Sequence, residues 1–376
     1  MRVLVLSKRQ YTGKDLLDDR YGRLFEIPSI LAARGNEVTG VALSYRCRRG
    51  GWYRWEDQPG LSWFSINAFP AGFWLYPRLL GKITADFRPD VVWACSDAFH
   101  GIAGSLLSSR FGTPLVIDLY DNFDSFAGTR LPGVKMLFHR ACRSADGLTV
   151  VSHALAGYVA AKYGPSMPPQ VLGNAVPRGL FFPRSKIECR KTLGLPLDKR
   201  LIGTVGAITE SRGISALFEA FLRLAARDRD LWLVFAGPRD DTPRRYRHER
   251  IIDLGTIGAD KVPVALNSLD VGVVCNLDSD FGRYCFPQKF YEMVACGLPL
   301  AAANVGEMKS LLARWPQLMF APNSVTGLAE CLRRQLSDPM PLSAIHVPTW
   351  EDRALELEHF LGCFVPCRRK RSALVD

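Results

Sequence analysis

The chain has 376 residues, of which 48% are hydrophobic, so it is long enough to bury two cores of ordinary domain size. It contains no run of about 18 apolar residues, which argues against a membrane span, and its ten cysteines form no Cys-x-x-Cys pair that would indicate a zinc site or a disulfide framework. The net charge of +11 predicts a partner of opposite sign, and in the absence of a nucleic-acid module we expect a cytoplasmic protein that meets an anionic membrane surface rather than nucleic acid.

The first half of the chain alternates apolar strands with amphipathic helices. Strands are predicted over residues 3–6, 37–43, 90–95, 114–118 and 147–152, and helices over 22–34, 101–110 and 154–163. Repeated βα units of this length predict a parallel, doubly wound sheet. Because ligands of such sheets bind beyond the carboxyl ends of the strands, we expect the loops after Leu6, Ile117 and Val151 to line a cleft.

Two segments of the first half combine aromatic and basic residues. Residues 46–55 mix arginines with tryptophan and tyrosine, and residues 69–77 continue the aromatic bias. Such residues favour a membrane interface, but they are equally compatible with packing inside the domain. The basic tail 367–372 is either an electrostatic tether or a solvated end.

After residues 165–185, which are rich in turn residues, the same architecture begins again. Strands are predicted over 200–206, 231–237, 251–255 and 270–275, and a helix over 214–226. Two Rossmann-like domains are therefore expected. The loop from Gly206 to Gly213 leaves a strand and enters a helix, so its N–H groups can line an anion pocket near Arg212. The alternative is that Arg212 is an ordinary surface residue at a helix start.

Residues 281–306 predict a loop, a short helix and a buried strand. Pro287 suits the first helical position, and Gly297 suits the left-handed position just past the helix end. Lys289 and Glu292 share one face, so the lysine can hold an anion at the helix start while the glutamate grips a diol one turn deeper. That pairing suits a nucleoside diphosphate. A solvent-exposed Lys289–Glu292 pair is the alternative.

The run Phe-Pro-Gln-Lys-Phe-Tyr-Glu-Met-Val-Ala-Cys-Gly-Leu-Pro-Leu-Ala, residues 286–301, resembles the donor-binding signature of retaining GT-B glycosyltransferases. This large family includes sucrose synthases and bacterial polysaccharide enzymes. The resemblance assigns Glu292 to the donor ribose. The family's first glutamate falls on Tyr284, which departs from the pattern at a position that contacts the sugar hydroxyls.

The same resemblance extends to three other loops. A lysine that holds the diphosphate matches Arg212, while its arginine partner is replaced by Ala207. Gly22 matches a glycine that lets phosphate approach the N-terminal loop. After the strand 114–118 the family often has His-Asp, and here Asp121 takes the aspartate position. Because aspartate is also a common turn residue, a purely structural role for Asp121 is equally open.

The resemblance implies an α/β, GT-B fold with two Rossmann-like domains facing across a cleft. The acceptor-side domain would span 1–172 and the nucleotide-sugar domain 173–348, with a final helix in 349–376 returning to the first domain. It further implies retaining, metal-independent transfer from a nucleotide-diphosphate sugar to a glycan or lipid-linked acceptor, without a cofactor. The setting would be cell-surface polysaccharide or lipid-linked glycan synthesis, in the cytoplasm or on the inner face of the membrane.

Two other functions remain open from the residues alone. The departures at Tyr284 and Ala207 are compatible with a non-catalytic subunit that binds a sugar nucleotide or glycan. A sugar-nucleotide epimerase on the same fold is the other alternative. A nicotinamide oxidoreductase is disfavoured, because neither strand–loop–helix start carries Gly-x-Gly-x-x-Gly.

Overall fold

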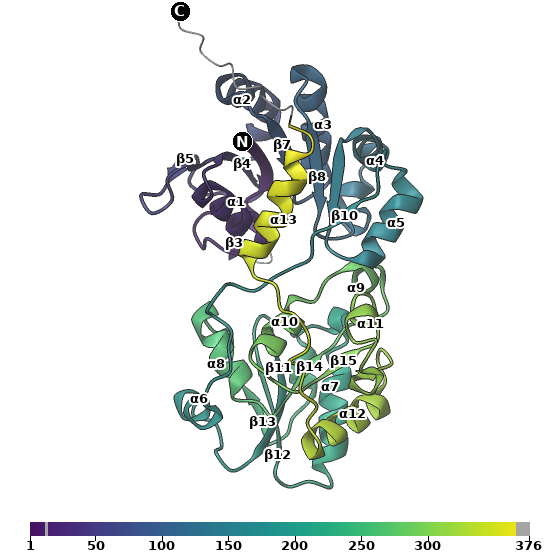
Figure 1. The fold of residues 1–376 in the computed structure, drawn as a ribbon. Coiled ribbons are helices and arrows are strands. Elements are labelled where there is room, and N and C mark those ends of the chain that lie inside the picture. The colour runs from purple at the N-terminus through teal and green to yellow at the C-terminus, as the bar shows by residue number, and fades with distance from the viewer. Residues whose placement is uncertain (12–13, 366–376) are drawn as a thin grey trace, which may run out of the picture. The chain divides into compact units, whose positions relative to one another are not determined.

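The structure is a computed structural model that describes residues 1–11 and 14–365, and these residues form two compact α/β units (Figure 1). The first unit contains Met1–Val151, Ala156–Gly173 and the described residues from Trp350 onward, and the second contains Ser152–Leu155 and Asn174–Thr349. Each unit is built on its own largely parallel sheet, which confirms the predicted fold class. The basic tail 367–372 lies outside the described residues.

The sheet of the first unit has the strand order β10-β9-β8-β7-β1-β4-β6-β5. Its strands are β1 (Arg2–Lys8), β4 (Glu37–Ser44), β5 (Gly51–Arg54), β6 (Leu61–Asn67), β7 (Val91–Ala94), β8 (Leu115–Leu119), β9 (Gly147–Val150) and β10 (Gln170–Val171). All neighbours pair in parallel except the edge strand β5, and Val3 of the central β1 aligns with Val38 and Val91 on its two sides. A short antiparallel pair, β2 (Gln10–Tyr11) and β3 (Lys14–Asp15), follows β1.

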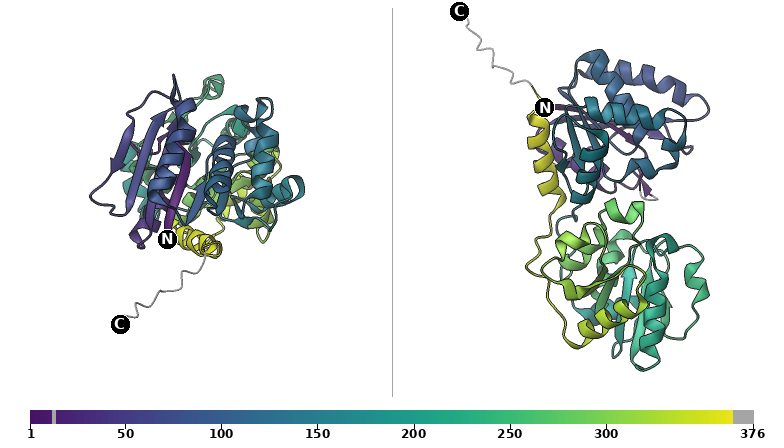
Figure 2. Two further views of the ribbon diagram at one scale, coloured as in Figure 1. Left: turned by 90° about the horizontal axis from the view of Figure 1, so that it is seen from above. Right: turned by 90° about the vertical axis from the view of Figure 1, so that its right-hand side faces the viewer.

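Helices cover both faces of this sheet. They are α1 (Arg23–Ala33), α2 (Gly72–Phe87), α3 (Ala98–Phe111), α4 (Val134–Ser144), α5 (His153–Tyr163) and α13 (Trp350–Gly362). The right-hand view of Figure 2 shows α13 on one side and the blue helices α2 and α3 on the other. The strands and helix between residues 51 and 87 were not predicted, because their aromatic residues were interpreted only as surface or packing residues. The signal for β6 is nevertheless present, since Leu61, Trp63 and Ser65 are buried while the residues between them are half-exposed.

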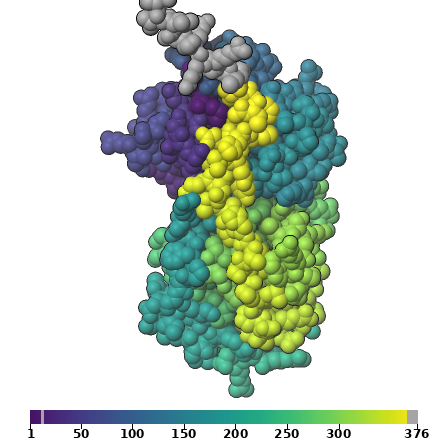
Figure 3. Space-filling view, in the orientation of Figure 1, coloured from purple at the N-terminus to yellow at the C-terminus, as the bar shows by residue number. Residues whose placement is uncertain are grey.

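The C-terminal helix α13 completes the first unit, and it runs along the surface of that unit in Figure 3. It packs against α1. Glu358 accepts hydrogen bonds from Arg34 Nε at 2.6 Å and from Asn36 Nδ2 at 2.7 Å. The first unit therefore depends on a segment that follows the second unit in the chain.

A buried ion pair fixes α1 to the sheet. Arg23 and Asp118 are both fully buried, and Arg23 Nη2 donates to Asp118 Oδ1 at 2.9 Å. Thr149 Oγ1 donates to the same oxygen at 2.6 Å. Burial raises the pKa of Asp118, and Arg23 opposes that rise. Because a buried charge needs a partner, Asp118 has a structural role in the core.

The second unit has a parallel sheet with the order β13-β12-β11-β14-β15-β16. Its strands are β11 (Arg200–Val205), β12 (Leu231–Ala236), β13 (Ile251–Asp253), β14 (Val271–Val274), β15 (Leu300–Ala303) and β16 (Met319–Phe320). Its helices are α6 (Lys186–Leu193), α7 (Ser215–Ala225), α8 (Val262–Asn267), α9 (Asp280–Tyr284), α10 (Gln288–Ala295), α11 (Met308–Leu311) and α12 (Val325–Ser337). No helix among residues 1–11 and 14–365 has both the length and the apolar character needed to cross a membrane.

Candidate functional site

Helix α10 carries the predicted donor-binding residues of the second unit. Pro287 is not its first helical residue, as the sequence suggested, but its N-cap, with φ −76° and ψ 94°, and its carbonyl accepts a hydrogen bond from Phe290 N at 2.9 Å. The extended backbone of Pro287 starts the helix one residue later than expected. Gly297 has φ +67°, the left-handed conformation that was predicted.

The side chain of Lys289 reaches from α10 to the carboxyl end of β11. Its Nζ lies 3.5 Å from Thr204 Oγ1. A Cβ built on Gly206 would lie 3.7 Å from Lys289 Nζ. Burial lowers the pKa of Lys289, and the positive charge of Arg212 lowers it further. The cation is therefore held against the loop that was predicted to bind an anion.

Arg212 lies at the other end of this loop, in the turn Glu210–Arg212. Its guanidinium carbon is 3.8 Å from the centroid of the Phe281 ring, a cation–π contact that orients the half-buried side chain. Within the described part of the chain, neither Arg212 nor Lys289 has a carboxylate at ion-pair distance. Two neighbouring cations without a counter-ion form a site suited to an anion of at least two charges.

Glu292 lies one turn beyond Lys289 but does not pair with it. Its Oε1 accepts a hydrogen bond from Gln288 Nε2 at 3.2 Å. Burial raises the pKa of Glu292 to about 7, and the charge of Lys289 opposes that rise. The alternative of a solvent-exposed Lys289–Glu292 pair is therefore wrong, because the lysine points to β11 and the glutamate does not contact it.

Glycines shape the backbone around the two cations. Gly206 has φ +122° and Gly213 has φ +70°, conformations that favour glycine. A Cβ on Gly213 would lie 2.7 Å from Leu277, so this glycine is also required for packing. Gly237, which the sequence analysis did not single out, has φ +130°, and a Cβ there would lie 2.1 Å from the carbonyl oxygen of Gly206. Its position directly after β12 was the available signal.

Tyr284 is the last residue of α9 and is half-exposed. The buried residues Cys285 and Phe286 separate it from the start of α10. The position at which the signature departs from the family pattern thus lies in a separate short helix, near Phe281 that stacks on Arg212.

The other two predicted site residues, Asp121 and Gly22, belong to the first unit. Asp121 follows β8, and its Oδ1 accepts a hydrogen bond from Asn122 N at 2.8 Å. Gly22 has φ +80° and precedes α1, where its carbonyl accepts from Phe25 N and Glu26 N, both at 2.9 Å. Its conformation favours glycine irrespective of any ligand.

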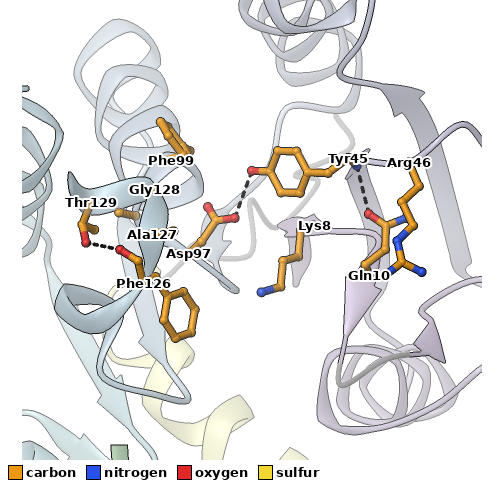
Figure 4. Close-up of a pocket in the computed structure, with 11 residues that line it drawn as sticks. Lys8, Gln10, Tyr45, Arg46, Asp97, Phe99, Phe126, Ala127, Gly128 and Thr129 are labelled. Carbon is orange, nitrogen blue, oxygen red and sulfur yellow. Dashed lines mark hydrogen bonds between the residues drawn. The ribbon is translucent and has the colours of Figure 1, made fainter. Parts of the chain in front are cut away.

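The first unit contains a cavity of about 620 Å³ at the carboxyl ends of β1 and β7 (Figure 4). The polar lining includes Tyr45 Oη, which donates to Asp97 Oδ2 at 3.0 Å. Lys8 lies beside this pair, and its Nζ is 5.2 Å from the ring centroid of Phe126. Burial lowers the pKa of Lys8, while the carboxylates of Asp97 and Asp121 oppose that shift.

His100 does not line this cavity, although it follows the predicted strand 90–95. It is fully buried on α3, and its Nδ1 lies 2.7 Å from Asp97 Oδ1. Burial alone would raise the pKa of Asp97, but His100 and Lys8 hold it below its usual range. Asp97 thus presents a charged carboxylate to the cavity. Lys8 and Asp97 were missed, although each stands at or just after the end of a predicted strand.

Comparisons with known proteins match both units to glycosyltransferase domains. Residues 26–175 match the model of the glycosyl transferase 4-like domain, and residues 199–338 match that of glycosyl transferases group 1. A Bacillus subtilis protein named as a teichuronic acid biosynthesis glycosyltransferase, TuaC, is 28% identical over 66% of this chain and 62% of its own length. The 2-deoxystreptamine glucosyltransferase of Streptomyces kanamyceticus is 26% identical over 65% of this chain and 66% of its own length. The chain thus matches somewhat less than two thirds of the length of these relatives.

Solved structures share the fold. Sucrose-phosphate synthase from Thermosynechococcus elongatus aligns with a TM-score of 0.76 at 17% identity, covering 96% of this chain and 98% of its own. The Anabaena protein HepE, solved in complex with UDP-glucose, aligns with a TM-score of 0.67 at 16% identity, covering 97% of both chains.

Proposed function

Because this chain belongs to the group 1 glycosyltransferases, we propose that it transfers a sugar from a nucleotide-diphosphate donor to a glycan or lipid-linked acceptor. The observation that carries the proposal is the pair of unneutralised cations, Arg212 and Lys289, beside the glycine loop that leaves β11. HepE, which was solved in complex with UDP-glucose, supports this class of donor. The transfer would retain the anomeric configuration and would need neither a metal ion nor a cofactor.

In this proposal the second unit binds the donor. Arg212 and Lys289 hold the diphosphate, and the free N–H groups at the start of α10 add to the positive potential. Breaking the glycosidic bond moves negative charge onto the diphosphate, and fixed cations stabilise that charge as it develops. Glu292, one turn deeper, accepts hydrogen bonds from the ribose hydroxyls. Tyr284, Gly206 and Gly213 complete the donor site, as the resemblance implied.

The cavity of the first unit is the proposed acceptor site. Its apolar walls, which include Phe99 and Phe126, suit the C–H faces of a sugar, and Lys8 and Asp97 offer a donor and an acceptor for its hydroxyl groups. Asp121 lies near Lys8 and would help to orient the reacting hydroxyl. Gly22 would let the backbone of its loop approach the donor. The name of TuaC favours an acceptor of cell-surface polysaccharide synthesis, in the cytoplasm or on the inner face of the membrane.

A thermal-shift screen against common sugar nucleotides, followed by a transfer assay with the donor that stabilises most, tests the proposal. Binding stabilises the folded state according to affinity, so the true donor should raise Tm more than its free monosaccharide. Sugar transfer, or slow donor hydrolysis without an acceptor, is the expected result. Donor binding with neither reaction would instead support a non-catalytic subunit, the alternative that Tyr284 and Ala207 favour.

A further inference from the structure

Large apolar side chains at and just before the start of α2 remain exposed to solvent in the described part of the chain. They are Phe69, Phe73, Trp74 and Leu75, with exposed fractions of 74, 43, 82 and 48%, and we refer to them as the α2 ridge. We propose that the α2 ridge docks onto the surface of an anionic phospholipid bilayer. The proposal needs only the first unit and does not depend on the transferase reaction.

The backbone fixes the ridge in its outward position. Gly72 packs so closely on the end of β6 that a Cβ there would lie 1.7 Å from the carbonyl oxygen of Asn67. Ala68 N donates to Ser44 O, and Phe73 N donates to Ala68 O, both at 2.7 Å. The opposite face of α2 is buried through Tyr76, Leu80 and Ile83. The exposed side chains therefore cannot turn into the core without breaking these contacts.

Basic side chains lie on α2 itself and on a loop that is hydrogen-bonded to the end of β6. Arg78 and Lys82 follow Trp74 by one and two helical turns and are exposed on the same face of α2. Arg46 and Arg49 lie on a loop that is hydrogen-bonded to Asn67 at the end of β6. In this loop the backbone N–H of residue 48 donates to Asn67 Oδ1 at 3.1 Å, and the carbonyl of residue 48 accepts from Asn67 Nδ2 at 2.8 Å. Within the described chain, none of these four cations has an ion-pair partner.

A bilayer with anionic headgroups matches both the exposed apolar side chains of the ridge and the nearby basic side chains. Tryptophan and phenylalanine are the residues that favour the headgroup boundary, and each nearby Lys or Arg is attracted by the negative surface potential. Two of the arginines that the sequence suggested for this role are occupied locally, because Arg48 contacts Asp15 at 3.3 Å and Arg54 lies over the Trp52 ring. Of the two segments suggested by the sequence, residues 69–77 therefore supply the apolar part of the proposed contact, and Arg46 and Arg49 of the other segment add positive charge.

The ridge also adjoins the cavity of the first unit. The Phe73 and Phe99 rings meet edge to face, with centroids 6.0 Å apart, and Phe99 belongs to the cavity wall (Figure 4). Arg46 lies on the cavity lining as well. If the proposed function holds, docking through the ridge would bring the acceptor cavity to the level at which a lipid carries its polar headgroup.

Co-sedimentation of the full chain with vesicles tests the proposal without any turnover. We expect binding to vesicles of phosphatidylcholine and phosphatidylglycerol at 7:3 and weak binding to phosphatidylcholine alone. Replacing Arg49, Arg78 and Lys82 by Gln should lower the partition coefficient about a hundredfold, because each basic residue near such a surface contributes roughly fivefold. Phe69→Ser with Trp74→Ser should lower it at least about tenfold.

Matched variants control for folding and for nonspecific stickiness. Met136→Ser removes an equally exposed apolar side chain, 69% accessible, from α4 of the same unit, and should bind as wild type does. Equal binding by the Phe69/Trp74 variant and wild type would overturn the proposal, as would the absence of wild-type binding at low salt. A dimer that dissociates when Phe69 and Trp74 are replaced, with no vesicle binding, would identify the ridge as a protein interface instead.

Discussion

Arg212 and Lys289 are close enough for the charge of one to lower the pKa of the other. Like charges repel, so their proximity has an electrostatic cost in the free protein that a bound diphosphate would remove. Phe281 and Thr204 hold the two side chains in place through a ring contact and a 3.5 Å approach.

The first prediction concerns the two cations. Arg212→Ala and Lys289→Ala should each lower kcat on the order of a hundredfold, because interactions that strengthen in the transition state act on the chemical step. A nucleoside monophosphate should bind both variants nearly as it binds wild type. Arg334→Ala, which removes a surface arginine already paired with Glu330, is the control and should leave kcat unchanged. Turnover that survives the Arg212/Lys289 double substitution would show that the diphosphate binds elsewhere.

The second prediction concerns the ribose. Glu292→Ala should weaken binding of a nucleoside diphosphate by roughly 1.5–3 kcal/mol, the contribution of hydrogen bonds to a charged group. A 2′,3′-dideoxynucleoside diphosphate should bind wild type and variant alike, because it lacks the hydroxyls that the carboxylate would accept from. Calorimetric titration with both ligands measures the difference. Equal losses for the two ligands would argue against a ribose contact.

The third prediction follows from the raised pKa of Glu292, about 7 against a usual value of 4.5. A carboxyl whose pKa rises on folding destabilises the folded state when it ionises. Its unfavourable contribution is therefore absent below about pH 4.5, grows as the pH rises, and is complete above about pH 7. Glu292→Gln should raise the Tm of the ligand-free protein at pH 8 and leave it nearly unchanged at pH 4.5. A Tm difference that is the same at both pH values would contradict the assigned pKa.

At the level of elements, the strongest sequence signals were the buried strands and the glycines that end helices. Runs such as 3–6 and 231–237 contain apolar residues with few interruptions, which is typical of parallel strands buried on both faces. The secondary structure of segment 51–87 was harder to predict, because β5 is a half-exposed antiparallel edge strand and α2 exposes aromatic residues on its outer face. Exposed aromatics contradict the usual helical pattern, so the helix was not recognised.

Helix α13 provides the fourth prediction, because its packing differs from residue to residue. Leu361 is fully buried, whereas Leu355 on the same helix is 38% exposed. Leu361→Ala should destabilise the first unit by about 2–5 kcal/mol, while Leu355→Ala should have a much smaller effect. Denaturant unfolding, monitored for each unit separately, would measure the change in unfolding free energy caused by each substitution. Equal effects would indicate that α13 does not pack stably on α1.

At the scale of the whole molecule, the sequence predicted the fold class well and the neighbours of the site residues poorly. The repeated βα pattern and the signature around Glu292 led to the two-sheet architecture that the structure confirms. The cavity of the first unit could not be predicted in the same way, because Lys8, Tyr45 and Asp97 lie at or just beyond the carboxyl ends of three separate strands. Only the sheet order, with β1 between β4 and β7, brings these strand ends together.

The return of α13 to the first unit has a consequence for biosynthesis. The ribosome completes the strands of the first sheet by Val171, but the helix that covers α1 is finished only at Gly362. About 190 residues separate these points, which takes on the order of 10–40 s at translation rates of about 5–20 residues per second. During that interval the surface of the first unit on which α13 later packs, part of which belongs to α1, is uncovered on the nascent chain. The N-terminal unit is therefore a candidate client for chaperones that bind nascent chains, and its maturation ends only after the second unit has been made.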